Sequence, residues 1–303
     1  MRNSEIWTTT FLSILKIDLK IMKPLRPAIA IPTGGLAGML GGLCGVGGGI
    51  VITPLLRHFT SASTQTITGT AMLSVTASAI GGGGAYASQG IADLPAAATM
   101  ASTAMCTTGL GVAVSRRISS GSLSRVFGLF LLGVAPLIAM RSSSTRQQSS
   151  AEVDRSGEEM GTRWERKRQS VELLANPSLE EALRFARLNA HFAAAGVVTG
   201  FSAGLLGVGG GIVMTTFMAM ATDMTQHEAV ATSVLAMIPT GLSSSFFHWR
   251  AGNIQLRAAA LLAASSTVAM TMSATYVAPN VSEEKMRYLF SALLLASGLR
   301  MLL

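Results

Sequence analysis

A glycine-rich stretch that occurs twice constrains this chain more than any other feature. Residues 34–54 read GGLAGMLGGLCGVGGGIVITP, and residues 196–216 read GVVTGFSAGLLGVGGGIVMTT. The copies align without a gap at an offset of 162 residues, the difference between positions 34 and 196. Chance does not explain this agreement, so the sequence predicts an internal duplication. The glycines that align in both copies are Gly34, Gly38, Gly42, Gly45, Gly47, Gly48 and Gly49 with Gly196, Gly200, Gly204, Gly207, Gly209, Gly210 and Gly211.

The composition restricts the class of protein that carries this duplication. Of 303 residues, 49% are hydrophobic and only 13% are charged, whereas soluble domains carry about 25% charged residues. The sequence therefore predicts an all-α, multi-pass integral membrane protein, placed in the plasma membrane. The formal net charge of +8 would suggest nucleic acid for a soluble protein. Here the basic residues lie mostly between apolar runs, as in cytoplasmic loops, so the expected partner is the lipid bilayer and not nucleic acid.

Charge divides the chain into four predicted segments. Residues 1–26 mix basic and apolar residues and are expected to form an interfacial segment. Residues 27–140 form the first membrane repeat and residues 188–303 the second. Between them, residues 141–187 form a polar linker with nine basic and eight acidic side chains. Its first part is predicted to be disordered, and Ser178 with Glu181 is predicted to cap a helix that leads into the second repeat.

Each repeat is predicted to contain one glycine-broken or re-entrant helical segment and about three further spans. Residues 27–56 carry no charge and, as a helix, would exceed the roughly 30 Å hydrocarbon core. Glycines crowd residues 41–49 in its middle, which predicts a helix, a break and a second helix. The further spans are expected at 67–88, 93–115 and 126–140. In the second repeat, the broken segment covers 188–222, followed by spans at 229–249, 258–281 and 286–303.

Two topologies remain open from the sequence. If each glycine segment crosses the membrane fully, each half has four spans and the halves are parallel. If each segment enters and returns, three full crossings remain per half and the halves are inverted. The positive-inside rule favours the inverted arrangement, because it gathers the loop arginines on the side of the N-terminus. These arginines are Arg57, Arg116, Arg117, Arg125, Arg250 and Arg257.

The breaks suggest a binding site for an anion. A broken helix in a membrane exposes backbone N–H groups at the N-terminus of its second part, with the positive end of the helix dipole behind them. If the halves face each other, two such ends meet near the midplane, the pattern of secondary transporters. The spans carry no carboxylate of the kind that a cation pathway usually shows. The predicted ligands are the backbone groups of Gly45, Gly47, Gly48, Gly49, Gly207, Gly209, Gly210 and Gly211.

Other residues in the spans have two readings. Thr70, Thr232 and Ser233 are predicted to add hydroxyl donors around the anion, or else to bond their own helix backbone. The spacing of Gly34, Gly38 and Gly42 is typical of helix packing. His227 and His248 lie near span ends and are expected at the membrane interface. Cys44 and Cys106 have no metal-ligand spacing, so no metal and no cofactor are expected.

Two enzyme classes are excluded by the pattern. No strand is predicted before Gly45 and no Gly-Lys-Ser/Thr follows it, so this is not a nucleotide-binding loop. The spans supply no buried carboxylate that could orient a histidine, which argues against a Ser-His-Asp site. The chain is therefore predicted not to be an enzyme.

The duplicated Gly-x-x-x-Gly-x-x-x-Gly-x-x-Gly-Val-Gly-Gly-Gly motif resembles the sulfite exporter TauE/SafE family, also described as 4-toluenesulfonate uptake permeases. The second copy is the closer match, with Ala231-Thr232-Ser233 and the segment from His248 to Gly252 following it. The resemblance covers about residues 30–140 and 188–303. It implies transport of a small sulfur-containing anion, such as sulfite or an organosulfonate, driven by an ion gradient. Thr216 replaces the proline that follows the first cluster as Pro54, and Ala71 stands where the second copy has Ser233. The alternative is a membrane scaffold or receptor subunit that keeps the fold without transporting.

Overall fold

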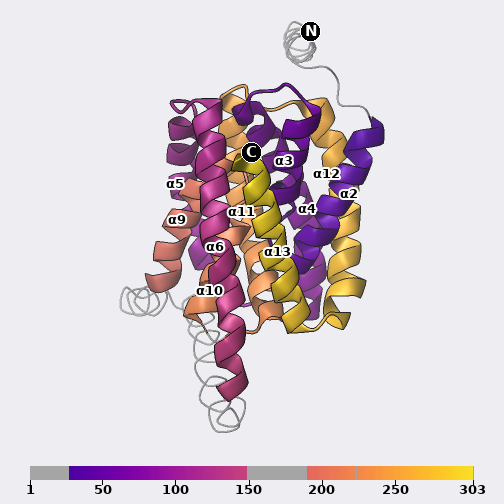
Figure 1. Ribbon diagram of the computed structural model, residues 1–303, viewed down its shortest axis with the longest axis vertical. Coiled ribbons are helices and arrows are strands. Elements are labelled where there is room, and N and C mark those ends of the chain that lie inside the picture. Colours follow the sequence, from indigo (N-terminus) through magenta and orange to yellow (C-terminus); the bar gives the residue numbers. More distant parts are fainter. Residues whose placement is uncertain (1–26, 149–189, 223, 303) are drawn as a thin grey trace, which may run out of the picture.

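The computed structural model describes residues 27–148, 190–222 and 224–302, and within these ranges it contains helices and no strand (Figure 1). The all-α prediction is therefore confirmed. The helices of the first half are α2 (Pro27–Cys44), α3 (Gly49–Phe59), α4 (Thr64–Gln89), α5 (Leu94–Ser115) and α6 (Ser120–Gln148). Those of the second half are α9 (Ala190–Leu206), α10 (Gly211–Ala221), α11 (Gln226–Arg250), α12 (Leu256–Met272), the short turns Ser273–Val277 and Ala278–Asn280, and α13 (Glu283–Leu302).

The helix ends follow from local residue chemistry. Ser63 and Asp93 cap α4 and α5 through their side chains, and Thr225 with Glu228 forms a capping box at the start of α11. Such caps satisfy N–H groups that the first turn leaves unpaired. After α4 and α11 the chain turns at Gly90 and Gly252, which have φ angles of 69° and 71°. That left-handed conformation is open to glycine at little cost.

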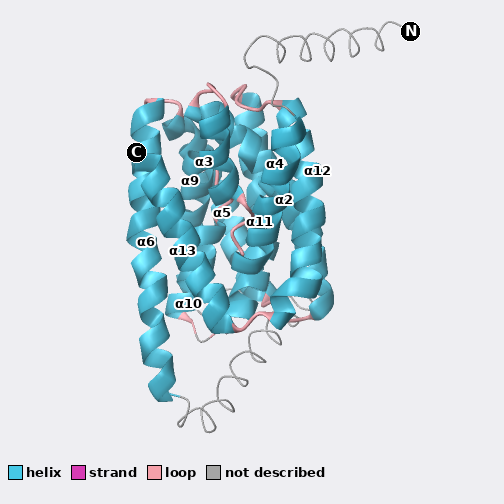
Figure 2. Cartoon of the chain, turned by 45° about the vertical axis from the view of Figure 1, so that its right-hand side comes forward, coloured by secondary structure: helices cyan, strands magenta, loops and turns pink. Residues whose placement is uncertain are grey.

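The two halves run in opposite directions through the bundle. The start of α2 and the end of α3 lie at one end, whereas the start of α9 and the end of α10 lie at the other (Figure 1). Both glycine breaks lie in the middle of the bundle, where Figure 2 shows loop between helices. The pairs α2–α3 and α9–α10 therefore enter and return, and α4, α5, α6, α11, α12 and α13 run between the two ends. This is the inverted arrangement that the loop arginines favoured.

The halves interlock through the glycine faces of α2 and α9. A Cβ atom added to Gly38 would lie 2.2 Å from the carbonyl oxygen of Ser266 on α12. One added to Gly200 would lie 2.0 Å from the carbonyl oxygen of Ala104 on α5. Each re-entrant helix thus packs on a helix of the other half, at a distance that only glycine permits. The packing role predicted for the glycine spacing is confirmed.

The lengths of several elements differ from the sequence prediction. Four described helical segments are long and apolar enough to cross a membrane: Pro27–Cys44, Leu94–Ser115, Gln226–Arg250 and Leu256–Asn280. The first of them is re-entrant, so hydropathy alone does not report the number of crossings. Helix α6 continues to Gln148, although residues from 141 onward were expected to be linker. The interfacial segment 1–26 and the helix capped by Ser178 lie outside the described residues.

Candidate functional site

The two glycine breaks meet in the middle of the bundle. Gly45, Gly47 and Gly48 have φ angles of 71°, 65° and 79°, and Gly207, Gly209 and Gly210 have 70°, 72° and 74°. A Cβ atom added to Gly49 would lie 3.0 Å from the Cα of Val208, and one added to Gly211 would lie 2.5 Å from the carbonyl oxygen of Gly45. All of these residues are buried. The structure thus brings the two glycine runs into contact with each other at Gly49 and at Gly211.

Each break ends in a helix N-terminus without a side-chain cap. The N-cap residues of α3 and α10 are Gly48 and Gly210, which have no side chain to offer to the first N–H groups. The first residue of each helix, Gly49 or Gly211, lies against the break of the other half. Two positive helix ends that lack side-chain caps therefore lie at one place, an arrangement that suits an anion.

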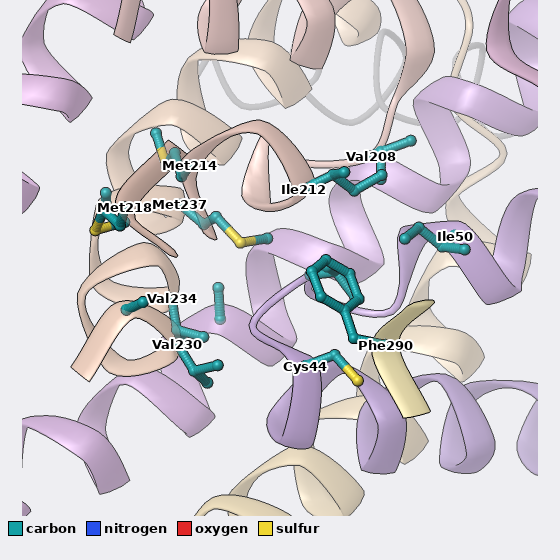
Figure 3. Packing of buried hydrophobic residues seen from close by; sticks show 14 of the residues in the cluster. Cys44, Ile50, Val208, Ile212, Met214, Met218, Val230, Val234, Met237 and Phe290 are labelled. Carbon is teal, nitrogen blue, oxygen red and sulfur yellow. The ribbon is translucent and has the colours of Figure 1, made fainter. Parts of the chain in front are cut away.

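Two apolar side chains fill the space between the breaks, and no pattern in the sequence pointed to either. They are Val75 of α4 and Met237 of α11, which occupy equivalent positions in the two halves. The Cε of Met237 lies within 2.6 Å of Cβ positions built on both Gly47 and Gly209, and Val75 Cγ1 lies within 2.7 Å of both. Met237 lies beside Ile212, across from Ile50 of the first break (Figure 3). The place where the two breaks meet, called the junction below, is therefore closed in this structure.

Hydroxyl groups are distributed unequally between the breaks. Thr215 Oγ1 and Ser233 Oγ are 3.3 Å and 3.1 Å from the carbonyl oxygen of Gly45, and 2.9 Å from each other. In the first half, the equivalents are Thr53 and Ala71. Thr53 is 1% exposed, and within the described residues its hydroxyl has no hydrogen-bond partner. Ser233 therefore lies beside the first break, but its hydroxyl also donates to the carbonyl oxygen of Val230 in its own helix at 2.8 Å, as the other reading expected. Thr215 beside it was not singled out.

Comparison with known proteins decides the family. The profile of the family described as "Sulfite exporter TauE/SafE" matches residues 16–173 and 192–303. This chain belongs to the TauE/SafE family. It is 26% identical over 223 residues to a "Probable membrane transporter protein" of Xylella fastidiosa (strain 9a5c), covering 73% of this chain and 74% of that protein. It is 25% identical over 233 residues to the "Probable membrane transporter protein YunE" of Bacillus subtilis (strain 168), covering 75% and 79%. No solved structure matches it.

Family membership and the apolar helices together establish this TauE/SafE chain as a multi-pass integral membrane protein of a transporter family. The gap between the two matched segments, residues 174–191, falls within and just after the predicted linker. The matched segments thus contain one glycine break each.

The structure does not bring Thr70 and Thr232 of this TauE/SafE protein to the breaks. The backbone N–H of Gln255 donates to Thr70 Oγ1 at 3.0 Å, and that of Asp93 donates to Thr232 Oγ1 at 2.9 Å. Asp93 and Gln255 are the N-cap residues of α5 and α12. Each hydroxyl therefore holds a helix start of the other half at one end of the bundle. A role for these threonines as anion ligands stays a prediction without geometric support.

A polar side chain faces the last turn of each re-entrant helix. The Tyr86 hydroxyl donates to the carbonyl oxygen of Gly42 at 2.5 Å. At the equivalent position of the second half, the His248 ring faces the backbone of Gly204. His248 is 0% exposed, so its expected interfacial position is wrong.

Proposed function

We propose that this protein is a secondary transporter for sulfur-containing anions such as sulfite or an organosulfonate, and that the anion binds where the two breaks meet. The observation that carries the proposal is the convergence of two uncapped helix N-termini on one buried place. Family membership supports transport, and the description of the family supports the class of solute.

The charges of the described residues fit an anion better than a cation. Among the buried side chains of the described residues, the only carboxylate is Asp93, which caps α5 at one end of the bundle. A cation pathway usually presents a carboxylate within the membrane. The breaks offer instead the N–H groups of two first helical turns, each carrying about half a positive elementary charge.

Transport requires the junction to open to each side in turn. The structure shows a closed junction, filled by Val75 and Met237. Methionine is unbranched and adapts its shape easily, so Met237 is suited to move aside when an anion enters. Because α2–α3 and α9–α10 enter from opposite ends, rocking of one pair would open the junction to one side and rocking of the other pair to the other.

The first test measures uptake of labelled sulfite and of a labelled organosulfonate into proteoliposomes. The variant is Gly49→Ala, which adds a Cβ atom 3.0 Å from Val208 Cα without requiring a positive φ. We expect uptake to fall at least about tenfold, because close approach of the breaks is part of the site, and tenfold corresponds to about 1.4 kcal/mol. Gly84→Ala on α4 is the matched control, since nothing lies within 4 Å of its added Cβ.

Each outcome has a distinct meaning. If Gly49→Ala takes up the anion as fast as the wild type, the anion binds elsewhere in the bundle. Absence of uptake by correctly inserted wild-type protein, for both solutes, would favour the scaffold or receptor alternative. Size-exclusion profiles in detergent show whether each variant is folded.

A further inference from the structure

The donors at the ends of the two re-entrant helices differ in one chemical property. Position 86 and position 248 are equivalent by the 162-residue offset, and so are Gly42 and Gly204. Tyr86 is 1% exposed and donates to Gly42, while His248 is 0% exposed and faces Gly204. A tyrosine hydroxyl stays neutral across the physiological range, whereas an imidazole changes its charge between about pH 5 and pH 8. One half therefore has a fixed donor where the other has a titratable one.

Each of these side chains lies beside the end of a re-entrant helix, where the helix leaves carbonyl groups unpaired. The last carbonyl groups of a helix have no intrahelical donor. Gly45 N donates to Gly41 O, and Gly207 N donates to Ala203 O. The next carbonyl along the chain is that of Gly42 or Gly204, where Tyr86 and His248 lie. The C-terminal end of a helix carries partial negative charge, so a protonated ring would be stabilised there more than a neutral one.

The surroundings of His248 offer no fixed charge that would settle its protonation state. Within the described residues neither ring nitrogen has a hydrogen bond of good geometry. Arg250 is exposed, and its guanidinium lies over Phe246. The ionisable residues on the described parts of the other helices that pack against α11 are Cys44 on α2, Tyr86 on α4, Cys106 on α5, His191 on α9, and Glu283, Glu284, Lys285, Arg287, Tyr288 and Arg300 on α13. None of these groups forms a hydrogen bond with a ring nitrogen of His248.

His248 follows Met237 by eleven residues on α11, about 16 Å along that helix, so its link to the proposed anion site runs through the end of α9. Gly204 precedes the first glycine of the second break, Gly207, by three residues, or about 4.5 Å along a helix. A charge that appears on the ring therefore appears beside the segment that positions the N-terminus of α10. It also lies near the end of α11, where Trp249 and Arg250 are exposed. A small displacement of α9 would connect the ring to water at that end.

We propose that His248 is the proton-binding residue that couples anion movement to a proton gradient, an inference that rests on the proposed transport function. One proton binds to a ring nitrogen from the side where the anion enters. The protonated ring holds the end of α9 while the anion occupies the junction, and the pair carries no net charge when the anion is monovalent. The proton leaves the ring on the other side together with the anion. Tyr86 holds the end of α2 in the same way, but at every pH.

The first experiment measures the pH dependence of uptake into proteoliposomes. The probe is labelled methanesulfonate, because its charge does not change where histidine titrates. For the wild type, we expect uptake with pH 5.5 outside to exceed uptake with pH 7.5 outside by about tenfold, since an imidazole that opens to water changes its charge across this range. In His248→Tyr, which copies the first half, this ratio falls to about one because tyrosine does not titrate in that range.

Tyr86→Phe is the matched control, since it removes the neutral donor and leaves the titratable ring. It keeps the wild-type ratio of uptake at the two pH values, even if its absolute uptake falls. A His248→Tyr protein that keeps the wild-type ratio would overturn the assignment of His248.

The second experiment does not depend on transport. Leu206 is the equivalent of Cys44, so Leu206→Cys in a Cys44→Ala/Cys106→Ala background places a thiol at the end of α9. We expect the pH dependence of the maleimide labelling rate at position 206 to differ between the protein that keeps His248 and the protein that also carries His248→Tyr. The ionisation of the thiol itself is common to both proteins and cancels. Native Cys44, in a Cys106→Ala background, should show no such difference.

The two experiments distinguish a failure of the proposed transport from a failure of the role proposed for His248. If the wild type takes up no methanesulfonate at any pH, transport of this anion is excluded, and the labelling experiment still tests His248. If the pH response of the thiol at position 206 is the same with His248 and with His248→Tyr, the proton-binding role is wrong, whatever the solute.

Discussion

At the scale of single residues, two threonines connect the halves reciprocally. Thr232 of the second half accepts the N–H of Asp93, and Thr70 of the first half accepts the N–H of Gln255. Both hydroxyls are buried. Each bond fixes the start of a long helix that the glycine face of a re-entrant helix packs against, α5 for α9 and α12 for α2. The threonines therefore contribute to the fold at the ends of the bundle.

This position changes what a substitution at Thr232 should do. Thr232→Val keeps the shape of the side chain and removes the acceptor for a buried N–H. We expect the free energy of unfolding to fall by about 1–3 kcal/mol, with little change in anion affinity. Thermal unfolding in detergent and equilibrium binding measure the two quantities. Thr271→Val is the control, because the Thr271 hydroxyl bonds the carbonyl of Thr267 in its own helix. A stable variant with weakened anion affinity would restore the ligand role.

At the scale of elements, the re-entrant helices are shaped by where glycine lies on their surface. Gly34, Gly38 and Gly42 face α12, and Gly196, Gly200 and Gly204 face α5. Gly35 lies one position away from this face, and nothing lies within 4 Å of its Cβ position. The glycines of α2 are therefore not equivalent, even though they lie in one apolar helix.

This difference predicts opposite effects of the same substitution within α2. Gly38→Ala should destabilise the protein by at least about 1–3 kcal/mol, because its Cβ would overlap the backbone of α12 at Ser266. Gly35→Ala should leave stability unchanged or raise it by up to about 1 kcal/mol, because alanine favours helix. Thermal unfolding of the two purified variants, compared side by side, measures the effect. Equal losses in both would contradict packing through this face.

The sequence predicted the glycine breaks but not the side chains that fill the space between them. The breaks were predictable because a run of glycines in an apolar segment disfavours continuous helix and permits left-handed backbone. Val75 and Met237 were not predictable, because an apolar residue in a span carries no sign of which neighbour it contacts. The burial of His248 had one available signal: the offset aligns it with Tyr86 inside an apolar run. Its nearness to Arg250 suggested the interface instead.

At the scale of the whole molecule, charge is distributed unevenly between the two ends of the bundle. Arg57, Arg116, Arg117, Arg125, Arg250 and Arg257 occupy helix termini at the end where α2 begins. The opposite end carries Asp93, Glu228, Glu283 and Glu284, together with Lys285 and Arg287. The positive-inside rule assigns the arginine-rich end to the cytoplasm.

Labelling of single cysteines from either side of the membrane checks this orientation. In a cysteine-free background, Ser61→Cys and Ser119→Cys should react from the cytoplasmic side, and Ser282→Cys only from the other side. All three positions are exposed at loops or helix ends. Reaction of the thiols at positions 61 and 119 from the same side as the thiol at position 282 would mean four crossings per half.

The contact between α2 and α12 can form only late in the synthesis of the chain. Gly38 packs on Ser266, which follows it by 228 positions, the difference between 266 and 38. A ribosome adds about 5–20 residues per second, so α2 leaves it roughly 10–50 s before α12 is made. During that interval the small-residue face of α2 has no permanent neighbour. During synthesis, the α2–α3 hairpin therefore depends on the insertion machinery, or on lipid, to cover this face until α12 is inserted.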